Sequence, residues 1–219
     1  MMIEEKLQSI KSIPAAYQTL SSFEKSLLHL ASIIYEPVSR AVFVNCLRRA
    51  GITGPAGEWL TAATLSPYIQ RLQNAGLLDK DWCCPESLVE LVSRAAVAAG
   101  DFREMSATVQ AEISFSQYQS KWPLRCLRAM REYRIGLYNS DIVHLENMHP
   151  VLDKQCRDEI VRFFPAVRFC NNPFDPDWLR THAPSLQFYL LSQMMNYSLH
   201  YLSLLEESFL YQDSSSNDR

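Results

Sequence analysis

The sequence predicts a mainly helical protein, and three observations lead to this prediction. Apolar residues recur at intervals of three and four along most of the 219 residues, which is the spacing of one helical face. Residues typical of helix starts and stops bound these stretches. Only six glycines are present, too few for an all-β protein with many tight turns.

The N-terminal half is predicted to hold four main helices after a short amphipathic helix in residues 1–19. The first main helix begins at Ser21–Glu24, where a hydroxyl cap precedes an acidic first-turn residue, and extends to about residue 34. The next spans about residues 38–50, after a proline and before a glycine. The third covers about 64–75 and the fourth about 87–99.

A short β-hairpin is expected between the third and fourth of these helices. Leu77 and Leu78 lead into a polar turn at residues 79–81, and Trp82–Cys84 is predicted to be a short strand. Because the turn contains no glycine, the hairpin would be small.

These elements resemble a winged-helix domain over residues 20–98. The resemblance rests on three helices, the phrase LSPYIQRLQNAGLL, the short hairpin and a closing helix. It implies a winged-helix-like N-terminal half, with the helix at 64–75 as the segment that would read a DNA groove.

The C-terminal half, residues 99–210, is expected to be helical to its end, as an irregular bundle or a helical repeat. Asp101 and Asp141 each follow a helix and are predicted to cap the next one. The last helix, from about Ser185, is apolar on nearly every face and should be surrounded by protein. The polar tail 211–219 is predicted to be disordered.

Neither a catalytic site nor a cofactor or metal site is predicted. The sequence contains no nucleotide-binding glycine loop, no GxSxG and no HExxH. Asp175 and Asp177 are interpreted as turn and helix caps. The six cysteines have no CxxC spacing and no signal peptide precedes them, so we expect reduced thiols in a cytoplasmic protein without a membrane segment.

A candidate nucleic-acid contact surface accompanies the winged-helix resemblance. The helix at 64–75 offers several polar outward side chains but one cation, and the formal charge of -3 argues against a strongly basic footprint. Arg40 could add to this surface. The candidate contacts are Arg48, Arg49, Tyr68, Arg71 and Lys80.

A second basic feature lies in the C-terminal half, as a ridge of cations at spacings of four and three. We expect it to be either a solvated helix face paired with acids such as Asp153, Asp158 or Glu159, or a surface for an acidic partner. The ridge consists of Lys121, Arg125, Arg128, Arg131 and Arg134.

The sequence therefore favours a non-catalytic interaction or regulatory module. Combinations of winged-helix and helical-repeat regions resemble accessory regions of multidomain ATPases and helicase-type proteins, which implies a longer chain as context. The partner would be another protein or another domain, and the apolar last helix could form a homodimer. Its candidate aromatic contacts are Phe188, Tyr189, Tyr197 and Tyr201. Two alternatives stay open: a DNA-binding transcriptional regulator and an enzyme with a dispersed site.

Overall fold

The computed structural model describes residues 15–115, 122–170 and 174–215. Predictions for the beginning of the N-terminal helix, for Lys121 and for the end of the polar tail lie outside these ranges. Within them the regular elements are α-helices, which confirms the mainly helical class. The chain divides into two compact units, residues 1–139 (unit 1) and 140–219 (unit 2).

Unit 1 is built around one buried helix. Its described helices are α2 (Ser22–Ile34), α3 (Arg40–Arg49), α4 (Ala62–Asn74), α5 (Glu86–Ala99), α6 (Phe102–Glu112) and α7 (Trp122–Tyr138). Helix α2 contacts each of the other five, and Leu27, Leu28 and Leu30 on it are fully buried. The core of unit 1 therefore surrounds α2 on several sides, whereas an amphipathic surface helix would bury only one face.

The N-terminus of α2 forms as the sequence predicts. The Ser21 side chain accepts a hydrogen bond from the Glu24 backbone N–H, and the Glu24 carboxylate accepts one from the Ser21 backbone N–H at 3.0 Å. This capping box satisfies two backbone donors at once. Tyr35, with φ 58° in the left-handed region, ends the helix.

The loop after α4 differs from the predicted hairpin. Leu77 and Leu78 are buried as expected, but no strand is found in residues 76–85. The Asp79 carboxylate accepts hydrogen bonds from the N–H groups of Asp81 and Cys83 at 2.8 and 2.9 Å, and Trp82 has φ 66°. A capped turn with a left-handed residue therefore replaces a strand, because Asp competes for these backbone donors.

The predicted boundary near residue 98 falls inside unit 1. Helix α5 ends at Gly100, whose φ of 83° suits glycine, and α6 then packs against α2, α3 and α5. Asp101 precedes α6 but its side chain makes no capping hydrogen bond, in contrast to the prediction. It accepts a hydrogen bond from His29 instead, so it joins α6 to α2.

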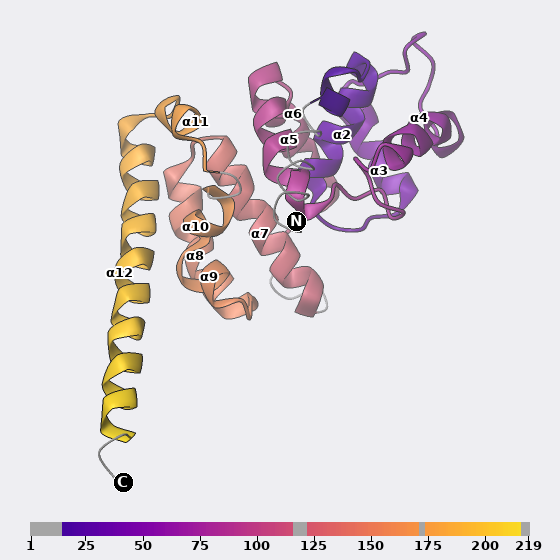
Figure 1. Cartoon of the computed structure of the whole chain (residues 1–219). Helices are drawn as coiled ribbons and strands as arrows, with labels where there is room; N and C mark the ends of the chain where they lie inside the picture. The colour runs from indigo at the N-terminus through magenta and orange to yellow at the C-terminus, as the bar shows by residue number, and fades with distance from the viewer. Residues whose placement is uncertain (1–14, 116–121, 171–173, 216–219) are drawn as a thin grey trace. The chain divides into compact units, whose positions relative to one another are not determined.

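The described residues of unit 2 form four short or medium helices and one long helix. They are α8 (Ile142–Gln155), α9 (Glu159–Phe163), α10 (Pro165–Cys170), α11 (Pro176–Arg180) and α12 (Pro184–Ser215). Asp141 and Asp175 cap α8 and α11 through their carboxylates, as predicted. Helix α12 packs against α10, and its C-terminal part continues well past α9 and α10 (Figure 1).

Candidate functional site

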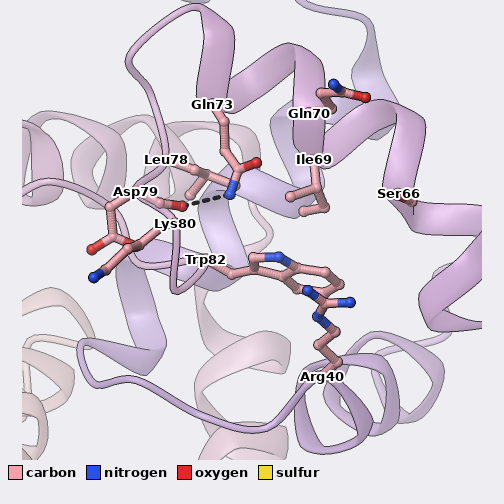
Figure 2. A pocket seen from close by; sticks show the side chains of 9 residues that line it. All are labelled: Arg40, Ser66, Ile69, Gln70, Gln73, Leu78, Asp79, Lys80 and Trp82. Atoms are coloured by element: carbon pink, nitrogen blue, oxygen red, sulfur yellow. Dashed lines mark hydrogen bonds between the residues drawn. The ribbon is translucent and has the colours of Figure 1, made fainter.

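An open pocket lies beside α4, and we call it the α4 pocket. Its volume is about 580 Å³. Polar lining comes from one face of α4, since Ser66, Gln70 and Gln73 are spaced by four and three residues. The opposite wall comes from the start of α3 and from the capped loop, which contribute Arg40, Lys80 and Trp82 (Figure 2).

The side chains around this pocket are held by specific contacts. The Arg40 guanidinium lies over the buried Trp82 ring, 5.4 Å from its centroid. Gln73 donates a hydrogen bond of 2.7 Å to the Asp79 carbonyl, which joins α4 to the loop (Figure 2). Lys80 and Arg40 are exposed and lie on different sides of Trp82. The pocket therefore has cations on two sides and amide groups between them.

Most of the predicted nucleic-acid contacts are engaged inside unit 1. Arg48 donates to the Leu60 carbonyl at 2.9 Å and stacks on Trp59. Arg49 pairs with Glu112 at 2.8 Å. Arg71 pairs with Glu24 at 2.9 Å, and Tyr68 packs edge-on against Phe23. Of the predicted set, the structure brings only Lys80 to the α4 pocket, together with Arg40, Ser66, Gln70 and Gln73.

The predicted basic ridge on α7 is not an exposed ridge. Arg131 and Arg134 are 0% and 2% exposed, so the prediction of a partner surface is wrong for both. Arg128 is 23% exposed, and Arg125 is half-buried. The physical reason is that Glu36 in the loop after α2, Glu90 on α5 and Glu132 on α7 itself pair with these arginines inside unit 1, so α7 can bury its basic face.

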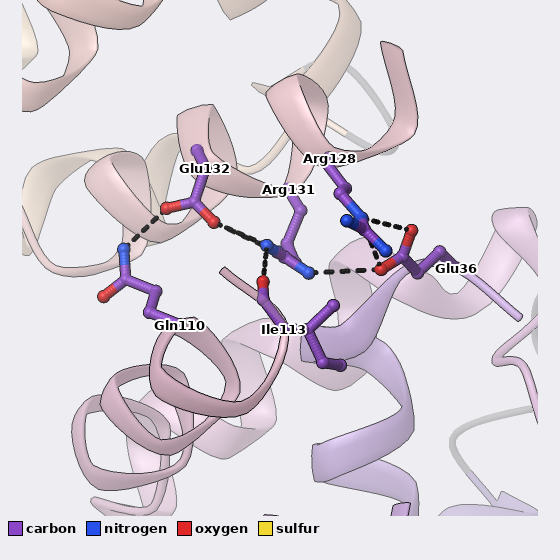
Figure 3. Close-up of polar contacts among 6 residues, drawn as sticks. All are labelled: Glu36, Gln110, Ile113, Arg128, Arg131 and Glu132. Atoms are coloured by element: carbon purple, nitrogen blue, oxygen red, sulfur yellow. Dashed lines mark hydrogen bonds and ion pairs between the residues drawn. The ribbon is translucent and has the colours of Figure 1, made fainter. Parts of the chain in front are cut away.

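The carboxylates of Glu36 and Glu132 accept hydrogen bonds from Arg128 and Arg131 in the first of two buried clusters (Figure 3). Glu36 accepts from Arg128 at 2.9 Å and lies 3.4 Å from Arg131. Arg131 also donates to Glu132 at 2.9 Å and to the Ile113 carbonyl at 2.6 Å. Glu132 in turn accepts from Gln110 at 2.6 Å.

Arg134 is the centre of a second buried cluster. It donates to Glu90 at 3.0 Å, to the Ser32 carbonyl at 2.9 Å and to the Ser93 hydroxyl at 2.7 Å. The Tyr138 hydroxyl donates to the other oxygen of Glu90. The sequence does place Glu36 and Glu90 at the end of α2 and on the apolar face of α5, but neither position predicts a partner 40 to 100 residues away.

A hydrogen-bonded Tyr–His–Asp chain joins three segments of unit 1. The Tyr17 hydroxyl lies 2.6 Å from Nε2 of His29, and Nδ1 of His29 lies 2.8 Å from the Asp101 carboxylate. Although the order of groups resembles a catalytic relay, His29 is 1% exposed, and the neighbouring residues line neither pocket described here. Burial lowers the pKa of His29, which favours its neutral form, so the chain connects α2 to α6 and residues 15–18.

Three of the described free thiols, those of Cys46, Cys83 and Cys84, are poor nucleophiles. Burial raises the pKa of Cys46 and of Cys83 to about 11, and that of Cys84 to about 12. Thiols with such pKa values stay protonated near neutral pH. Cys126 and Cys156 are disulfide-bonded, which differs from the expected reduced state.

Helix α12 carries an exposed apolar stripe, which we call the α12 stripe. It consists of Phe188, Leu191, Met195, Leu199 and Leu202, which are 75%, 47%, 60%, 58% and 56% exposed. At about 100° per residue these five positions fall within a sector of roughly 80°. The buried residues Leu186 and Leu190 lie on the opposite side of the helix.

The predicted aromatic contacts of α12 divide between its two sides. Phe188 belongs to the α12 stripe, and Tyr201 is 54% exposed. Tyr189 and Tyr197 are half-buried, and Tyr197 packs edge-on against Phe164 at 5.3 Å. Two of the four aromatic residues are therefore accessible to a partner.

Unit 2 also contains a cavity of about 510 Å³ between α8, α9 and α12. Two charged residues of its lining, Arg162 and Asp153, form an ion pair with each other at 2.9 Å. His149 and Glu146 also line it. This internal pairing leaves the cavity without an obvious electrostatic preference for a ligand.

Two further observations concern the described residues as a set. They contain no group of three or more His, Cys, Asp or Glu side chains arranged to hold a metal ion. None of the helices they form combines the length and apolar character needed to cross a bilayer. Comparison of the chain with known proteins finds no matching family model, no matching curated protein and no matching solved structure.

Proposed function

We propose that this chain is a non-catalytic interaction module that assembles with a second copy of itself through the α12 stripe. The observation that carries the proposal is a row of five large apolar side chains, each 47% or more exposed, along one side of a helix. Exposed apolar patches of this kind are typical of protein–protein interfaces.

The spacing of the stripe favours another helix as its partner. Phe188, Leu191, Met195, Leu199 and Leu202 follow one another at intervals of three, four, four and three residues. Such intervals allow the side chains of two helices to interdigitate along a seam. A globular partner with a flat surface would not require this regularity.

The absence of charge favours a second copy over a different helix, and the exposed area is large enough for such a pair. No Asp, Glu, Lys or Arg occurs from residue 181 to 205. Two copies of this segment could therefore meet across a two-fold axis without repulsion between like charges. The five side chains expose on the order of 100 Å² each, so two copies would bury about 1,000 Å². That area reaches the lower limit for a specific interface.

Substitutions on and beside the stripe test this proposal. Leu199→Glu should raise the dimer dissociation constant by at least about 100-fold, because two-fold symmetry buries two glutamates. Asn196→Glu places the same charge on the same helix at an exposed position outside the stripe and should leave association unchanged. Sedimentation velocity over a range of concentrations measures both. Equal behaviour of the two variants and the wild type would contradict the proposal.

The wider context of the module remains a proposal as well. Mutual contacts among α2, α3 and α4, and the buried Leu77–Leu78 pair after α4, support a winged-helix-like arrangement, whereas the capped loop lacks a wing strand. A role as an accessory region of a larger ATPase or helicase rests on the sequence resemblance alone. A cytoplasmic location agrees with the free thiols but not with disulfide-bonded Cys126 and Cys156.

DNA binding is the weaker function. It needs several cations converging on one face, and Arg48, Arg49 and Arg71 are engaged within unit 1. Catalysis has no positive support, since the Tyr–His–Asp chain is buried and the thiols with raised pKa values are protonated.

A further inference from the structure

We infer that the α4 pocket of unit 1 binds a short acidic peptide segment of a partner protein. This site is separate from the α12 stripe and does not depend on self-association. Four observations support the inference: the exposed cations of the pocket, its amide groups, its packed floor and the internal pairing of the neighbouring arginines.

The cations of the pocket are available for a ligand. Arg40 and Lys80 are exposed, and neither forms an ion pair with a carboxylate among the described residues. Asp79, the acidic residue of the pocket lining, accepts hydrogen bonds from the backbone N–H groups of Asp81 and Cys83. A carboxylate of a ligand would therefore meet cations that the protein itself leaves without an acidic partner.

The polar groups between the cations match a peptide backbone. Ser66, Gln70 and Gln73 present hydroxyl and amide groups on one face of α4. Amide side chains donate and accept hydrogen bonds, as backbone N–H and C=O groups require. Gln73 already has one N–H engaged by the Asp79 carbonyl, which orients its amide oxygen for a donor from outside.

The apolar floor of the pocket is held by packing within unit 1. Trp82 is 8% exposed, and its ring lies under the Arg40 guanidinium. The buried side chains Ile69 and Leu78 form the remainder of its floor. A pocket of about 580 Å³ is within the size range of ligand sites, and preorganised side chains reduce the entropic cost of binding.

Charge distinguishes a peptide from a nucleic acid as the occupant. A nucleic-acid backbone would need a row of cations, but the other arginines of α3 and α4 are paired internally, and Asp79 adds a negative charge to the pocket. An acidic peptide needs two cations and several amides, which is the set present here.

Fluorescence anisotropy with the full chain tests this inference. The probe is a fluorescein-labelled octapeptide of alternating aspartate and glutamate between glycines, and its counterpart carries asparagine and glutamine. The acidic peptide should bind saturably, and at least about tenfold more tightly than its counterpart. Arg40→Gln and Lys80→Gln should each weaken binding at least about fivefold, since each substitution removes one of the two exposed cations of the pocket.

Arg103→Gln is the matched control, because Arg103 is exposed on α6 and does not line the pocket. It should bind the acidic peptide as the wild type does. Three results would overturn the inference: no saturable binding at millimolar protein, equal loss in Arg103→Gln, or tighter binding of a short DNA duplex than of the peptide. None of these results bears on α12.

Discussion

The buried arginines of α7 show how strongly a single residue can depend on distant partners. Arg131 and Arg134 have the spacing of an exposed basic stripe, yet each is almost fully buried and paired. Their partners Glu36 and Glu90 come from the loop after α2 and from α5. The sequence pattern predicts that the cations share a helix face, but it does not show whether that face is exposed or buried against acidic residues.

Replacing Arg131 should cost unit 1 much of its stability. Arg131→Met removes a buried cation that pairs with the carboxylates of both Glu36 and Glu132 and should lower the free energy of unfolding by about 3–5 kcal/mol. Arg49→Met removes an arginine whose side chain is 60% exposed, so its loss should be below about 1 kcal/mol. Urea unfolding followed by circular dichroism measures both. Similar losses in the two variants would contradict the buried network.

His29 should make the stability of unit 1 depend on pH. Burial lowers its folded-state pKa below the ordinary 6.5, while Asp101 acts in the opposite direction. Between the folded and unfolded pKa values the unfolded chain binds more protons, so stability is complete above about pH 6.5 and decreases as pH falls below it. The stability difference between wild type and His29→Gln should therefore shrink from pH 7.5 to pH 5.5. A constant difference over this range would refute the assignment.

At the level of elements, local signals predict helix ends better than strands or loops. The caps at Ser21, Asp141 and Asp175 form as the sequence indicates, because each depends on backbone groups only a few residues away. Asp101 and the loop at residues 79–83 are the exceptions. Asp101 accepts a hydrogen bond from His29 instead of capping α6, and Asp79 caps a turn where a hairpin was expected.

The capping box of α2 should contribute measurably, since α2 is the central helix of unit 1. Ser21→Ala removes the acceptor of the Glu24 N–H and should lower the free energy of unfolding by about 1 kcal/mol. Ser26→Ala, at a half-buried position where the hydroxyl donates to the Ser22 carbonyl within the same helix, should change it by less than about 0.5 kcal/mol. Thermal unfolding measures the stability of both variants. Equal losses in the two variants would contradict a stabilising role for the Ser21 cap.

At the level of the whole chain, the sequence predicts the helical class and most helices but not how they group. The expected boundary at residue 98 fails to separate the units because α6 and α7 complete the core around α2, through contacts such as Arg134 with Ser32. Long-range pairing of this kind has no local signal. The α4 pocket was partly predictable from Lys80 and the polar face of α4, whereas the contribution of Arg40 depends on the position of Trp82.

The α12 stripe illustrates the same limit for function. Its apolar character is visible in the sequence, and so is the absence of charge from residue 181 to 205. The uncovered side becomes evident only when Leu186 and Leu190 are seen to be buried on the opposite side. That asymmetry turns a helix expected to be surrounded by protein into one with a free face.

The most direct test of the central proposal is the mass of the wild-type chain at sedimentation equilibrium. One chain has a mass of 25.2 kDa, and pairing through the α12 stripe predicts a mass that rises with concentration toward twice that value. It also predicts that the Leu199→Glu chain remains at the single-chain mass under the same conditions. A wild-type mass that stays at 25.2 kDa across the whole concentration range would contradict self-association.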